Sequence, residues 1–151
     1  TTCTYEVAGK YIANMSETQL AHVRNKKIAY VFKNFMLLAG LTALQKVKLP
    51  LIYAGVDKKE RHERSVAALT EVGLADRATH LPYELSGGQE QRVAVARAIV
   101  NNPKFILADE PTGALDTKTS TQIMDLFNEL NKQGSTIIMI THDREIGEAA
   151  A

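Results

Sequence analysis

The chain has 151 residues, 45% of them hydrophobic, which is enough for one globular domain with a buried core. Its 18 basic and 17 acidic residues leave a formal net charge of +1, so composition gives no general attraction to nucleic acids or anionic lipids. The single cysteine, Cys3, excludes an internal disulfide, and the absence of a signal-peptide pattern and of any apolar run near the ~20 residues of a membrane span predicts a soluble cytoplasmic domain.

The first half of the chain alternates between strand-like and helix-like segments. The alternating or apolar runs 4–8 and 28–32 predict strands, and NFMLLAG (34–40) predicts a loop. Helix starts are predicted by capping residues, which are Ser16 with Gln19, Thr42 with Gln45, and Asp57. The first helix covers about 17–25, and Pro50 limits or kinks the second. The third, in KKERHERSVAALTEV, ends at Gly73, and we expect its buried side to consist of Val66, Leu69 and Val72.

The second half continues the alternation with stronger signals. A helix after LSGGQ ends before Pro103, and its expected core face is Val93, Ala96, Ile99 and Val100. FILAD (105–109) has four apolar residues without alternation, which predicts a strand covered on both faces. A helix over about 117–132, ended by Gly134, leads to the strand STIIMIT (135–141). Helix-sized segments between buried strands predict an α/β fold with a parallel sheet.

Side chains that can bind a metal or transfer a proton follow the two most apolar predicted strands. Asp109 and Glu110 end one strand, and His142 follows the other, at the sheet edge where open α/β folds bind ligands. Neighbouring side chains on a strand point to opposite sides, so one carboxylate could hold a metal while the other polarises an attacking water. The alternative is that the two acidic residues simply begin a loop and that the histidine makes a structural hydrogen bond.

The stretch LSGGQEQRVAVARA (85–98) begins a helix in an unusual way. Ser86 is a good N-cap, but Gly87 and Gly88 each cost roughly 1 kcal/mol relative to alanine in a helix interior. They also bare backbone N–H groups at the positive end of the helix dipole, which is a phosphate-binding arrangement. With the acidic pair and the histidine, this arrangement suits phosphoanhydride hydrolysis, in which positioning and charge stabilisation supply most of the catalysis.

The order LSGGQ (85–89), FILADEPTGALD (105–116) and THD (141–143) resembles the ATP-binding cassette (ABC) ATPases. The likeness extends over nearly the whole chain and is greatest to the lipoprotein-release and macrolide-export type of transporter ATPase. It implies a partial P-loop NTPase fold, a single domain over 1–151 with a helical subdomain at about 34–85 and a catalytic α/β part at about 86–151. It implies ATP and Mg²⁺ as ligands, with the following roles: Ser86, Gly87, Gly88 and Gln89 on the γ-phosphate of ATP held by a second subunit, Asp109 on Mg²⁺, Glu110 as general base, Asp116 between subunits, and His142 as γ-phosphate sensor.

Two departures from this family stand out. The family's phosphate loop, G-x-x-x-x-G-K-[ST], does not occur: the one Gly-Lys pair is Gly9-Lys10, with Thr4 and Tyr11 at the flanking positions. We therefore expect the 151 residues to be the central portion of such an ATPase and to bind Mg²⁺·ATP weakly or not at all when alone. Lys33 stands where the family usually has glutamine at the nucleotide site, and a positive charge there opposes metal binding; the alternative is a solvated lysine at a strand end.

Three functions stay open at this point. The first is the ATPase subunit of an exporter, with a second ATPase subunit and a membrane-spanning permease as partners and a location at the inner face of the cell membrane. The second is a non-hydrolysing remnant that acts as a binding or structural module. The third is a relative that works in DNA repair or translation, which the near-neutral charge disfavours, so no nucleic-acid partner is expected. Uncovered strand edges also predict self-association.

Overall fold

Parallel strands and the helices that connect them form the framework of the chain in a computed structural model, which describes residues 6–7, 10–11, 15–33 and 39–149. The strands are β1 (Glu6–Val7), β2 (Lys10–Tyr11), β3 (Ile28–Phe32), β4 (Phe105–Asp109) and β5 (Thr136–Ile140). The helices are α1 (Glu17–Lys27), α2 (Ala43–Tyr53), α3 (Lys58–Glu71), α4 (Gly87–Ile99), α5 (Thr117–Lys132) and α6 (Arg144–Ala149), with short 3-10 turns η1 (Ala75–Arg77) and η2 (Pro82–Glu84). No helix in this part of the chain has the length and hydropathy needed to cross a membrane.

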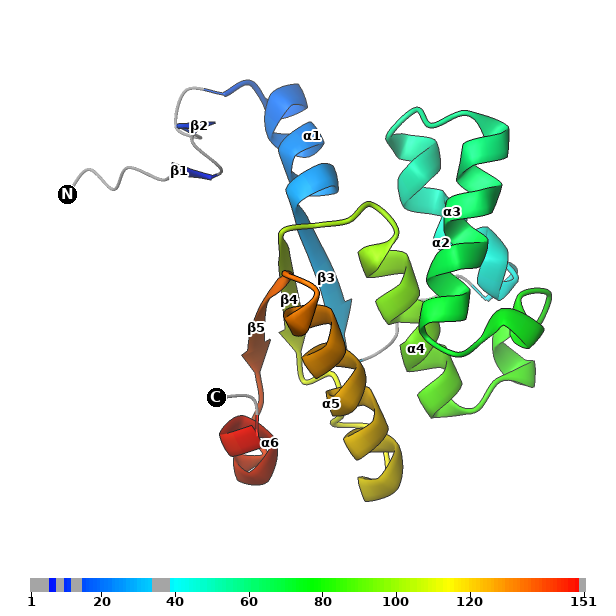
Figure 1. The fold of residues 1–151 in the computed structure, drawn as a ribbon, viewed down its shortest axis with the longest axis vertical. Coiled ribbons are helices and arrows are strands. Elements are labelled where there is room, and N and C mark those ends of the chain that lie inside the picture. Colours follow the sequence, from blue (N-terminus) through cyan, green and yellow to red (C-terminus); the bar gives the residue numbers. More distant parts are fainter. Residues whose placement is uncertain (1–5, 8–9, 12–14, 34–38, 150–151) are drawn as a thin grey trace.

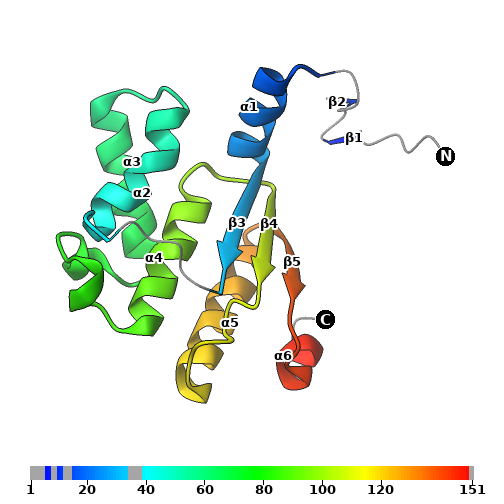
Figure 2. The same cartoon turned by 180° about the vertical axis from the view of Figure 1, so that it is seen from behind.

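The main sheet is parallel and has the order β3-β4-β5. In its register Phe32 lies beside Asp109, and Asp109 lies beside Ile140, so all three strands end together. Figures 1 and 2 show these carboxyl ends at the same end of the molecule as the first turns of α4 and α5. The predicted parallel α/β organisation is confirmed. The expected strand 4–8 is represented by β1, which pairs antiparallel with β2, while residues 4, 5 and 8 lie outside the described part.

Helix α4 is the centre of the core, because it packs on the sheet with one side and on α2 and α3 with the other. Its buried residues go around the helix: Gln91, Val93, Ala94, Val95, Ala96, Ala98 and Ile99. The prediction of a single core face was therefore incomplete. A helix that is apolar all round must be covered all round. The small alanines that alternate with valines let the sheet approach closely on one side and α2 and α3 on the other.

Only one face of the sheet is covered by helices within the described part of the chain. Ile106 and Ala108 of β4 are buried beneath α4 and α5, whereas Leu107 on the other face is half-buried. On that same outer face Ile138 and Ile140 of β5 are 50% and 59% exposed. The expectation that strand 105–109 is covered on both faces is therefore wrong for the described residues, and Figure 2 shows the strands uncovered on this side.

The predicted helix starts are confirmed, since Ser16, Thr42, Asp57 and Ser86 each accept a hydrogen bond from the first turn of the following helix. Two details differ. Helix α2 continues through Pro50 to Tyr53. On α3 the buried residues are Ser65, Ala68 and Leu69, followed by Val72, whereas Val66 is 37% exposed, so its assignment to the buried side was wrong. The predicted loop over 34–40 lies largely outside the described residues.

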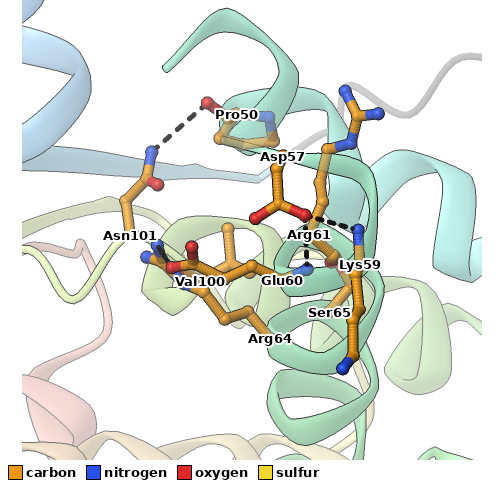
Figure 3. Close-up of polar contacts among 9 residues, drawn as sticks. All are labelled: Pro50, Asp57, Lys59, Glu60, Arg61, Arg64, Ser65, Val100 and Asn101. Atoms are coloured by element: carbon orange, nitrogen blue, oxygen red, sulfur yellow. Dashed lines mark hydrogen bonds and ion pairs between the residues drawn. The ribbon is translucent and has the colours of Figure 1, made fainter. Parts of the chain in front are cut away.

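Polar contacts fasten α2 and α3 to the carboxyl end of α4 (Figure 3). Arg64 of α3 donates to the carbonyl of Val100 at 2.8 Å, and this bond satisfies a carbonyl that the end of α4 leaves unpaired. Asn101 donates to the carbonyl of Pro50 at 3.5 Å, a carbonyl that α2 exposes to its neighbour. The helices within 43–84 are thus anchored on the same helix that carries LSGGQ at its other end.

Candidate functional site

The carboxyl ends of the three parallel strands bring together the first group of predicted site residues. Lys33 follows β3, Asp109 and Glu110 end and follow β4, and His142 lies just beyond β5. The backbone N–H of Glu110 donates to the carbonyl of Ile140 at 2.8 Å, and the backbone N–H of His142 donates to Glu110 Oε1 at 2.5 Å. We call Lys33, Asp109, Glu110 and His142 the strand-end cluster.

Glu110 occupies an unusual backbone position in this cluster. Its φ of +48° is in the left-handed region, which non-glycine residues seldom adopt and which is frequent at functional sites. This conformation turns the chain sharply after β4 and brings the carboxylate back over the sheet edge, where His142 N–H holds one of its oxygens. The Glu110 side chain is thereby fixed at one oxygen, and the other is free of hydrogen bonds from described residues.

The side chains of Lys33 and Glu110 both lie close to Gly113. A Cβ at Gly113 would lie 3.1 Å from Glu110 Oε2 and 3.2 Å from Lys33 Nζ, so both charged groups border the same small space. The two groups do not reach the 4.0 Å of an ion pair. Lys33 is exposed, as a solvated strand-end lysine would be, yet its ammonium faces the acidic end of β4.

The second group of predicted residues lies on the first turns of α4 and α5. Ser86 caps α4: its hydroxyl accepts from Gln89 N–H at 3.3 Å, while the Gln89 side chain accepts from Ser86 N–H at 3.0 Å. Asp116 caps α5: its carboxylate accepts from Thr119 N–H at 3.0 Å. Ser86, Gly87 and Asp116 are exposed, and Gly88 and Gln89 are half-buried. We call Ser86, Gly87, Gly88, Gln89 and Asp116 the helix-start cluster.

Hydrogen bonds from Thr119 lower the pKa of the Asp116 carboxyl below its ordinary value, the side-chain bond being the main cause and the backbone bond the next. The positive end of the α5 dipole acts in the same direction. Asp116 is therefore a fixed negative charge on an exposed helix start. It contrasts with Ser86, which caps α4 without a charge of its own.

No hydrogen bond or ion pair between described residues joins the strand-end cluster to the helix-start cluster. The prediction that Asp109, Glu110 and His142 lie at one sheet edge agrees with the structure, while LSGGQ lies at the start of α4. Sequence reasoning missed a link between Gln91 and Pro111: buried Gln91 of α4 donates to the carbonyl of Pro111 at 2.7 Å. The available signal was the spacing: Gln91 lies four residues before Val95 and seven before Ala98, which places it on the same apolar face of the helix.

The strand-end cluster fits a Mg²⁺ that is shared with phosphate groups. Among the described residues no group of three or more His, Cys, Asp or Glu side chains could hold a metal by itself. Mg²⁺ differs from other metals in this respect, because it is usually held by one or two carboxylates together with water and substrate phosphates. The exposed carboxylate of Asp109 at the end of β4 supplies a ligand of that type.

Comparisons with known proteins agree on one family. A family model described as ABC transporter matches residues 4–113. The chain is 57% identical over 148 residues to the uncharacterized ABC transporter ATP-binding protein YknY of Bacillus subtilis, with 98% of this chain and 64% of YknY covered. It is 44% identical over 150 residues to the macrolide export ATP-binding/permease protein MacB of Agrobacterium fabrum, covering 99% of this chain and 23% of MacB.

A solved structure leads to the same conclusion about the fold. The dimeric post-hydrolysis state of the ATP-binding cassette MJ0796, bound to ADP and Pi, superposes with a TM-score of 0.81 at 41% identity. The superposition covers 95% of this chain and 64% of the MJ0796 chain. The α/β architecture described above is thus the cassette fold of these ATPases, and the chain spans about two thirds of the length of the single-cassette relatives it matches.

Proposed function

The chain belongs to the ABC transporter family, and from this membership we propose that it is the ATP-hydrolysing part of an exporter, which couples ATP binding and hydrolysis to movement of a substrate through a membrane-spanning permease. The observation that carries the proposal is the hydrogen bond between His142 N–H and Glu110, which fixes an acidic side chain at the shared end of three parallel strands. The macrolide-export relatives, whose printed name joins an ATP-binding and a permease function, support the coupling to a permease.

In the proposed mechanism Glu110 is the general base. Its unbonded carboxylate oxygen accepts a proton from water, the water oxygen bonds to the γ-phosphorus of ATP, and the bond from that phosphorus to the ADP oxygen breaks. Asp109 would hold Mg²⁺, which when bound neutralises charge on the phosphates. His142 lies next to the base and would sense the γ-phosphate through its imidazole, while its backbone N–H keeps Glu110 in place.

The helix-start cluster has a separate role in this proposal. Ser86, Gly87 and Gly88 present backbone N–H groups and a positive helix end, which favour the γ-phosphate of a nucleotide held on another subunit, and Gln89 supports the turn. Asp116 lies beside them at the same subunit boundary. Separation of the two clusters within one chain supports this arrangement, because each would complete the site of the partner subunit. The dimeric state of the MJ0796 cassette supports it too.

The phosphate loop of the family does not occur in the 151 residues, so the second function from the sequence is kept as the alternative: a folded module that binds partners but does not hydrolyse ATP. The proposal also assigns residues 34–85 to a helical subdomain that contacts the permease, and 86–151 to the catalytic part. The protein would then lie at the cytoplasmic face of the membrane through that permease.

The test is hydrolysis of Mg²⁺·ATP by the protein expressed from its own gene, compared with Glu110→Gln. The variant should bind ATP as tightly as the unmodified protein and accumulate as a closed dimer, with hydrolysis lowered by about 100-fold or more because the base is lost. Glu63→Gln, at an exposed carboxylate of α3, is the matched control and should hydrolyse normally. Unchanged turnover in Glu110→Gln would remove Glu110 as the base, and no turnover in the unmodified protein would favour the non-hydrolysing module.

A further inference from the structure

Thr119, in the first turn of α5, holds both carboxylate oxygens of Asp116. Its hydroxyl donates to Oδ2 at 2.6 Å, and its backbone N–H donates to Oδ1 at 3.0 Å. At this helix position a capping box would place a Glu or Gln whose side chain turns back to the N-cap amide. Threonine binds the N-cap carboxylate itself, so the Asp116 side chain has little freedom to rotate.

The methyl group of the same threonine faces Gly88 of α4. A Cβ built at Gly88 would overlap Thr119 Cγ2, with Thr119 Cβ and Oγ1 at 3.7 and 3.8 Å. Gly88 is not among the described glycines with positive φ, which are Gly55, Gly73 and Gly134. Space, and not backbone conformation, is therefore the reason for glycine at 88: the first turns of α4 and α5 touch there.

A cavity of about 260 Å³ borders this contact and is lined by Ser86, Gly88 and Thr119 together with residues of α4, of α5 and of the segment that follows α3. Within this lining, the Thr119 methyl is the group that lies directly against Gly88 of the turn. Both halves of the helix-start cluster, the turn and the Asp116 carboxylate, meet at one side chain.

We propose that Thr119 is a positioning residue that holds the Asp116 carboxylate with its hydroxyl and the Ser86–Gly88 turn with its methyl, so that both segments meet a nucleotide in one fixed geometry. The effect on hydrolysis rests on the proposed function. The positioning itself does not, because it is a property of the folded chain without nucleotide.

Two conservative substitutions separate the two contacts. Thr119→Val keeps a methyl toward Gly88 and removes the hydroxyl, so the pKa of Asp116, followed by NMR of its carboxyl carbon, should rise toward the ordinary aspartate value while the Gly88 amide resonance stays in place. Thr119→Ser keeps the hydroxyl and removes the methyl, so the Gly88 amide resonance should move while the Asp116 pKa stays low. Thr121→Val, at an exposed threonine two residues along α5 whose hydroxyl donates to the carbonyl of Thr117, is the matched control and should change neither signal.

In the hydrolysis assay, Thr119→Val and Thr119→Ser should each lower kcat by about tenfold with little change in KM, because in each variant one of the two segments is less well positioned toward the nucleotide in the transition state. A merely structural role would lower Tm and leave kcat of the folded protein unchanged, and that result would overturn the proposal. An Asp116 pKa that stays low in Thr119→Val, or a Gly88 amide that stays in place in Thr119→Ser, would overturn it as well. If the unmodified protein hydrolyses no ATP, the proposed function fails, while the two NMR signals still decide the positioning.

Discussion

The side-chain amide of Gln91 donates to the backbone carbonyl of Pro111 at 2.7 Å inside the core. This bond ties α4, the helix that carries LSGGQ, directly to the segment that follows Glu110. Pro111 is fully buried, so its carbonyl has no water to replace the glutamine.

Replacement of Gln91 by leucine should therefore destabilise the protein. The side chain keeps most of its volume, but the Pro111 carbonyl loses its partner, which costs about 1 to 3 kcal/mol in free energy of unfolding. Removal of Gln91 Oε1, which is buried without a hydrogen-bond partner among the described residues, offsets part of this cost, so we expect a loss near the lower end of that range. Urea unfolding followed by circular dichroism measures the change. Gln133→Leu, at the exposed end of α5, is the control and should stay within about 0.5 kcal/mol of the unmodified protein. Equal stability of the two variants would show that the Gln91 bond contributes nothing net.

Lys33 should weaken the binding of Mg²⁺ at the strand-end cluster. Its ammonium borders the same space as Glu110 Oε2, and a unit positive charge a few ångströms from a metal site costs about 1 kcal/mol where water screens it. In Lys33→Gln the Mg²⁺ concentration for half-maximal ATP hydrolysis should fall roughly three- to tenfold. The difference should shrink at high salt, because exposed charges are screened. Lys58→Gln at the start of α3 is the control, and an equal shift there would mean that net charge alone is responsible.

Lys46 of α2 should make stability rise with pH in the alkaline range. The side chain is 1% exposed, and its ammonium has no hydrogen-bond partner among the described residues. Burial lowers its pKa from 10.5, and attraction to Glu90 offsets this only in part. Between the lowered pKa and 10.5 the unfolded chain binds more protons than the native one, so native stability increases as pH rises through that window.

Lys46→Met should accordingly be more stable than the unmodified protein by about 1 to 2 kcal/mol at neutral pH, since an unpaired buried cation is replaced by an apolar chain of similar length. The advantage should narrow as pH approaches 10.5. Chemical unfolding at a series of pH values tests both statements. Lys48→Met on the same helix serves as the control, and an advantage independent of pH would contradict the assignment to the Lys46 charge.

The outer face of the sheet should drive self-association of the 151-residue chain. Ile138 and Ile140 are exposed on β5, which pairs on one side with β4 in the described part of the chain. Ile138→Lys should lower the association constant measured by sedimentation, because a charge on an edge strand opposes pairing. Gln133→Lys adds the same charge on an exposed site of α5 and should not do so. A monomeric unmodified chain at high concentration would refute this prediction.

Local patterns were sufficient for much of this molecule. Ser86 and Asp116 are N-caps because the bonds that define them reach only three residues along the chain, so their signal is complete in a short stretch of sequence. The gathering of Asp109, Glu110 and His142 followed from parallel strands, whose carboxyl ends share one edge. Motif likeness then indicated the family that the comparisons bear out, while the roles of these residues stay predictions.

Tertiary packing alone decided the rest. Val66 and Leu69 are both apolar, but Leu69 is buried and Val66 is 37% exposed, because the direction in which α3 is docked selects which side is covered. Gln91 is buried although it is polar, since α4 is enclosed by the sheet on one side and by α2 and α3 on the other. The reason for glycine at 88 likewise lies in Thr119, 31 positions away on another helix. Periodicity and caps are local properties of a sequence, whereas a close approach between two helices exists only once both are packed.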